Sequence, residues 1–109
     1  MTIKSKDWYA WLNTMPPKPD DFHVVGDVEV ANPGVEAFLI RRSPQGFVPE
    51  ALMLDLYLVQ RPGNWSQQMS WTQARFDQVM TPSTPIYKTV EIFYEGERIA
   101  FIEHIGRAS

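Results

Sequence analysis

The stretch Ala51–Gln60 constrains the fold of this chain most, because a leucine recurs at every second position, at 52, 54, 56 and 58. Side chains alternate between the two faces of an extended strand, so all four leucines would point to one side. On a helix the same spacing would scatter them around the axis. The pattern therefore predicts a β-strand with one aliphatic face, and with it a β core that the rest of the chain completes.

Similar patterns predict strands on both sides of the leucine strand. From Phe22 onward, apolar residues at alternate positions predict a half-buried strand with Asp27 and Glu29 on its outer face. Residues 35–42 are extended with apolar residues on both faces. Further along, Glu95-Gly96 fits a two-residue hairpin loop between two strands, which would pair Ile92 with Ile99 and Val90 with Phe101. Proline- and glycine-containing turns separate most of these segments.

Residues 65–80 fit two structures. As a helix, Ser70 and Gln73 would form a capping box. As a strand, Thr72, Ala74 and Phe76 would point inward. Short connections to strands on either side favour the strand, as part of a meander.

The N-terminal segment predicts a short helix over residues 5–15. Trp8, Trp11 and Leu12 lie at spacings that place them on one helical face. Residues 16–21 contain three prolines, and proline fixes the backbone and lacks an N–H donor. We therefore expect a stiff Pro-rich linker between the helix and the body of the protein.

These elements predict a mainly β fold in one domain, residues 1–109. A chain of 109 residues is long enough for one ordinary core and too short for two. The expected organisation is a helix at 5–15, a linker at 16–21 and a β-sandwich of five or six antiparallel strands at 22–105. Immunoglobulin-like and transthyretin-like sandwiches both bury strands of this kind; a small open barrel is the alternative.

Composition excludes several classes of function. A net charge of −3 and a pI near 5.3 give no basic patch for nucleic acid. No apolar run approaches the roughly 18 residues of a membrane span. Zero cysteines exclude disulfides, thiolate metal sites and cysteine nucleophiles. Because the basic first residues are followed by no apolar stretch, we expect no secretory signal and a cytoplasmic location.

No motif predicts an active site, a metal or a cofactor. No serine lies in a Gly-x-Ser-x-Gly elbow, and the glycines form no phosphate-binding loop. His23 and His104 would need a carboxylate from another strand to bind a metal, and no local cluster supplies one. We therefore expect two surface histidines.

Asp55 is the carboxylate that stands apart, because it shares a face of the leucine strand with Tyr57. Either it lies in a binding pocket, or it pairs with Arg41, Arg42 or Arg75 on a neighbouring strand. Buried carboxylates more often have a charge partner than a substrate, so the sequence favours the ion pair.

The aromatic residues provide the best functional candidates, namely Trp8, Trp11, Trp65, Trp71 and Tyr57. Our first hypothesis is a non-enzymatic interaction domain that binds a protein partner or itself, through a strand edge or the N-terminal helix. The second is a carbohydrate or small-ligand binder that uses Trp65, Trp71 and Tyr57. An enzyme of unknown reaction, built on Asp55 or a histidine, is the third.

Overall fold

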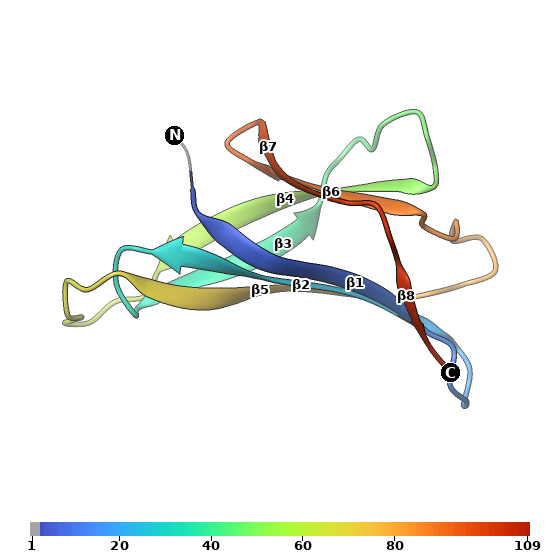
Figure 1. Ribbon diagram of the computed structural model, residues 1–109, viewed down its shortest axis with the longest axis horizontal. Coiled ribbons are helices and arrows are strands. Elements are labelled where there is room, and N and C mark those ends of the chain that lie inside the picture. Colours follow the sequence, from blue (N-terminus) through green and yellow to red (C-terminus); the bar gives the residue numbers. More distant parts are fainter. Residues whose placement is uncertain (1–2) are drawn as a thin grey trace.

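Eight strands form two sheets that pack face to face in the computed structural model, which describes residues 3–109 (Figure 1). Sheet A has the strand order β5-β2-β1-β8 and sheet B the order β3-β4-β6-β7. The strands are β1 (Ser5–Asn13), β2 (Asp21–Val30), β3 (Val35–Arg41), β4 (Ala51–Gln60), β5 (Ser70–Val79), β6 (Thr89–Tyr94), β7 (Glu97–Ile102) and β8 (Gly106–Ala108). The predicted mainly β fold is confirmed. The described residues include no helix, hence none long and apolar enough to cross a membrane.

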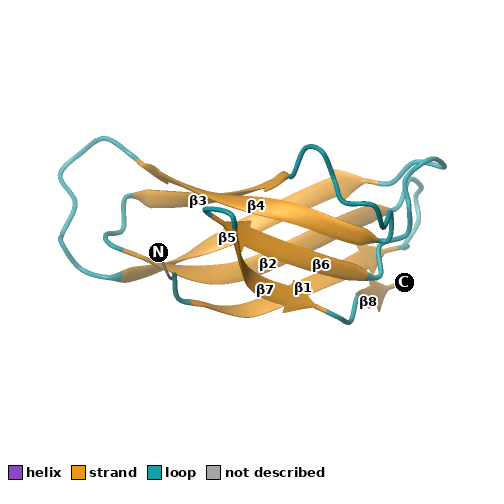
Figure 2. Cartoon of the chain, turned by 90° about the horizontal axis from the view of Figure 1, so that it is seen from above, coloured by secondary structure: helices purple, strands orange, loops and turns teal. Residues whose placement is uncertain are grey.

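Two strand pairs are parallel, which differs from the antiparallel meander that we expected. β1 runs parallel to β8, and β4 runs parallel to β6. After β4 the chain leaves sheet B, adds β5 to the edge of sheet A beside β2, and returns to sheet B as β6 (Figure 2). Parallel neighbours need such a long connection. The alternation within a strand does not reveal which sheet it joins, so the sequence pattern missed this crossing.

The core lies between the sheets and contains the predicted apolar positions. On β4, Leu52, Leu54 and Leu56 are buried, which confirms the strand with one aliphatic face. On β2, burial alternates residue by residue, with Phe22 and Val24 inside. Each large apolar side chain removed from water in this way contributes about 1.5–3 kcal/mol.

The predicted N-terminal helix is wrong, because this segment forms β1 in the middle of sheet A. The pairing with β2 shifts register between Lys6 and Tyr9, and Asp7 lies in this irregularity with φ of 56°. Beyond it Ala10 and Leu12 point into the core. A short helix is marginal in water, whereas β1 gains pairing and a buried face.

The Pro-rich residues 16–21 do not separate a helix from the body. Asn13 pairs with Asp21 across sheet A, so residues 14–20 form the loop that joins β1 to β2. The strand interpretation of the segment 65–80 is confirmed for its second part, which forms β5. There Ala74 is buried, while Trp71 and Arg75 are exposed.

The β6–β7 hairpin has the predicted two-residue loop, with positive φ at Glu95 and Gly96. After the pair of Phe93 with Arg98 the register shifts by one residue. Residue 92 therefore faces residue 100, not the predicted 99, and residue 90 faces 102, not the predicted 101. This bulge turns Ile102 into the core and leaves Phe101 exposed on the outer face of sheet B.

Candidate functional site

The structure does not bring the six predicted site residues together. Asp55 and Tyr57 lie on the outer face of sheet B. Trp11 and Trp71 lie on the outer face of sheet A, on β1 and β5. The two remaining tryptophans pack elsewhere, so no single site contains the predicted set.

Trp8 and Trp65 are packing residues. The Trp8 indole covers Gly26 so closely that a Cβ built there would lie 2.1 Å from the ring. The Trp65 indole covers Gly34 in the β2–β3 turn in the same way, at 2.3 Å. The Trp65 Nε1 also donates a hydrogen bond to the Arg61 carbonyl oxygen at 2.9 Å. Both indoles therefore fill the space that a side chain would occupy at these glycines, and this packing stabilises the fold.

On sheet A the aromatic rings contact their own neighbours, while Tyr9 and Trp71 stay 51% and 45% exposed. Trp11 stacks against Tyr9 with centroids 5.5 Å apart and lies 4.9 Å from the His23 ring. The Lys6 Nζ sits 4.2 Å from the Trp71 ring centroid. Tyr57 lies on the other sheet, so the three residues of the carbohydrate hypothesis do not converge.

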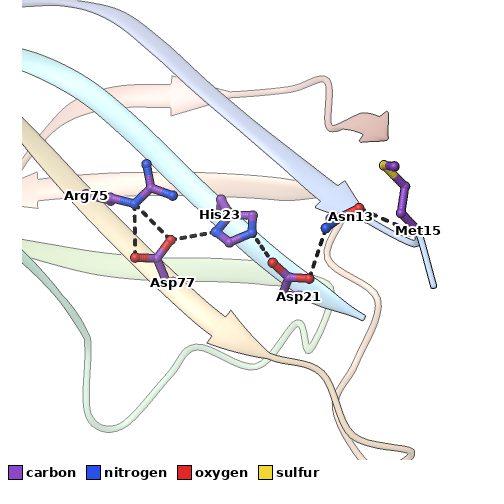
Figure 3. A network of polar contacts seen from close by, with 6 residues as sticks. All are labelled: Asn13, Met15, Asp21, His23, Arg75 and Asp77. Carbon is purple, nitrogen blue, oxygen red and sulfur yellow. Dashed lines mark hydrogen bonds and ion pairs between the residues drawn. The ribbon is translucent and has the colours of Figure 1, made fainter. Parts of the chain in front are cut away.

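A polar network links β1, β2 and β5 on the outer face of sheet A (Figure 3). The His23 Nδ1 lies 2.5 Å from an Asp77 oxygen, and its Nε2 contacts Asp21. The Asn13 amide donates to Asp21 at 3.2 Å, and the Arg75 Nε donates to both Asp77 oxygens at 3.0 Å. The network ties three adjacent strands together.

This network lowers the pKa of Asp77. Burial alone would raise that pKa, but hydrogen bonds from His23 and Arg75 outweigh it. Both ring nitrogens of His23 face carboxylates, those of Asp77 and Asp21. The ring is also only 14% exposed, so His23 is less open than the surface histidine we expected. Within residues 3–109, no group of three or more possible ligands is placed to hold a metal.

Asp55 forms the predicted ion pair, and its partner is Arg42, directly after β3. The Arg42 Nη2 and Nε donate to the Asp55 carboxylate at 2.8 to 3.3 Å. The hydrogen bond to Asp55 raises the pKa of Arg42, although burial opposes this. The guanidinium also lies 4.0 Å from the Phe93 ring centroid. The Asp55 carboxylate is therefore neutralised by a permanent cation.

Around this ion pair, the outer face of sheet B carries a set of exposed large apolar side chains. We call this set the apolar face; it consists of Phe38, Ile40, Tyr57, Val59 and Phe101. Phe38 pairs with Tyr57 across β3 and β4, and Ile40 pairs with Asp55. Sequence reasoning named only Tyr57 among them. The apolar residues on both faces of residues 35–42 were the signal for Phe38 and Ile40.

Comparisons with known proteins add no relative: no family model, no curated protein and no solved structure matches this chain. The functional argument therefore depends on the geometry of the chain itself.

Proposed function

We propose that this protein is a non-enzymatic interaction domain that self-associates, with the apolar face as the contact between two copies. One observation carries the proposal: five large apolar side chains, each more than two-fifths exposed, lie on one side of sheet B. Four of them, Phe38, Ile40, Tyr57 and Val59, lie on the neighbouring strands β3 and β4, and exposed apolar patches of this kind mark interaction sites. The sequence suggested a strand edge or an N-terminal helix as the contact; the helix segment forms β1, and the proposed contact is a sheet face.

The charges around the apolar face favour a second copy as the partner. A two-fold axis brings one patch against itself, so a patch with net charge would repel its own copy. This face carries three carboxylates and three guanidinium groups, although the whole chain has a net charge of −3. They form three pairs, namely Glu36 with Arg61, Asp55 with Arg42 and Glu91 with Arg98. The face is therefore neutral and compatible with itself.

The size of the face can be compared with that of known interfaces. Strands β3, β4, β6 and β7 have seven, ten, six and six residues. At about 3.3 Å per residue and about 4.8 Å between strands, the flat sheet covers roughly 460 Å² before the relief of the side chains is added. A stable interface of ordinary size buries about 800 Å² on each partner, and weaker ones bury less. Face-to-face packing of the two B sheets therefore lies at the lower end of the range of interface sizes.

The sandwich type, immunoglobulin-like or transthyretin-like, stays a prediction, and dimerisation through the apolar face does not depend on it. Outer faces of sheets can pack on each other as inner faces do.

The test compares two tyrosines that are equally exposed. Tyr57 on the apolar face and Tyr9 on the outer face of sheet A are each 51% exposed. We expect the wild-type chain to sediment at twice its 12.6 kDa mass at about 100 µM. Tyr57→Lys places an uncompensated charge in each half of the interface, and we expect a monomer. Tyr9→Lys should remain a dimer. A wild-type monomer, or equal dissociation by both variants, would overturn the proposal.

A further inference from the structure

A cavity of about 330 Å³ lies where the loop before β6 meets the segment between β7 and β8. Its floor belongs to the core, since Leu12 and Phe22 are buried. Its walls are also apolar and come from Met80, Ile86 and Ile105. Ile86 is 60% exposed, so it stands at the open side of the cavity. The cavity offers a place where an apolar group would be removed from water.

The rim of the same cavity carries two cations, Lys88 and Arg107. Five other basic residues form ion pairs with carboxylates, namely Lys18, Arg42, Arg61, Arg75 and Arg98. Within the part of the chain that the structure describes, no side-chain hydrogen bond or ion pair engages Lys88 or Arg107. Glu103 and His104 complete the rim. Two unpaired cations therefore outnumber one carboxylate, in a protein whose net charge is negative.

We propose that this cavity binds a small amphipathic carboxylate, with its alkyl chain inside and its carboxylate at Lys88 and Arg107. Arginine and lysine form strong charge-assisted hydrogen bonds with a carboxylate. Small-molecule sites occupy about 300 to 1,000 Å³, so this cavity lies at the small end of the range. A medium-length chain such as that of octanoate matches this size better than a long-chain fatty acid.

The site is independent of the proposed dimer. None of the residues that line the cavity belongs to the apolar face. The failure of either proposal therefore leaves the other intact, and the two are tested by different readouts.

Calorimetry with three ligands of equal chain length tests whether the head group is recognised. We expect octanoate to bind at least tenfold more tightly than octanol, and octylammonium to bind most weakly. Hexanoate should bind roughly fifteenfold more weakly than octanoate, because each methylene removed from water is worth about fourfold in affinity. Equal affinities for the three head groups, or no binding of octanoate at about 5 mM, would overturn the proposal.

Substitution of the rim tests which residues bind the head group. Lys88 and Arg107 are exposed, so Lys88→Gln with Arg107→Gln should leave the fold intact. We expect this double variant to lose at least tenfold in octanoate affinity and to bind octanol as the wild type does. Arg41→Gln, at an exposed base on β3 outside the cavity, is the matched control and should bind octanoate normally. An unchanged octanoate affinity in the double variant would contradict the assignment.

Discussion

Replacing Gly26 by alanine should destabilise the protein, because Trp8 occupies the space that the new methyl group needs. A Cβ at Gly26 would lie 2.1, 2.3 and 2.5 Å from three atoms of the indole. These separations are much shorter than van der Waals contact distances, and the ring cannot bend to relieve them. The indole packs against the core and its Nε1 is buried. It must therefore shift away from β2 and lose part of that packing.

The expected magnitude combines two opposing effects. Overpacking of a well-filled core costs about 1–3 kcal/mol, and this overlap belongs to the upper half of that range. Alanine recovers about 0.5–1 kcal/mol relative to glycine, because the unfolded chain has less freedom to lose. The net free energy of unfolding should therefore fall by about 1–2.5 kcal/mol. For a domain of this size each kcal/mol corresponds to about 4–8 °C in Tm.

Thermal unfolding at a fixed protein concentration measures this effect. Gly46→Ala is the matched control, because its Cβ would meet only the flexible Met53 sulfur, at 3.1 Å. We expect that variant to unfold near the wild-type temperature. In a Trp8→Leu background the penalty of Gly26→Ala should largely disappear, since the clashing ring is gone. A Gly26→Ala protein as stable as the wild type, or a penalty that persists without the indole, would refute the reasoning.

Two further predictions concern the core and the polar network. Leu54→Ala removes a fully buried side chain of the leucine strand. Urea unfolding should show that the free energy of unfolding falls by about 2–5 kcal/mol. A fall of less than about 1 kcal/mol would contradict the central position of β4. The pKa of Asp77 is lower in the folded state than the ordinary value of 3.8, so its contribution to stability is present above that value. That contribution is lost as the pH falls through the lower folded-state pKa. Asp77→Asn should therefore flatten the acid limb of a plot of stability against pH, and an unchanged limb would show that the network does not act through this carboxylate.

Local periodicity predicted the strands that have one clear apolar face. β4 and β2 follow the two-residue period along most of their length, and no helix fits the same residues. β1 was mistaken for a helix because Trp8, Trp11 and Leu12 also match a helical stripe. The irregularity at Asp7, visible only from the pairing with β2, breaks the strand period at that point.

The candidate site was predictable in part, where it depends on which side chains share a face of a single strand. The pair of Asp55 with Arg42 follows from placing a carboxylate beside an arginine-bearing strand, and the structure contains it. Phe101 was assigned opposite Val90, but the bulge in β7 turns it outward. The move of β5 to sheet A depends on contacts between residues distant in sequence. No local pattern encodes those contacts.

The most direct test of the central claim is an isotope-filtered NOE experiment on a mixture of labelled and unlabelled chains. Signals between the two kinds of chain report only contacts across an interface. We expect them to connect the methyl groups of Ile40 and Val59 to ring protons of Phe38, Tyr57 or Phe101 of the other copy. Intermolecular signals confined to Tyr9 and Trp71 on sheet A, or none in a sample at about 1 mM, would contradict dimerisation through the apolar face.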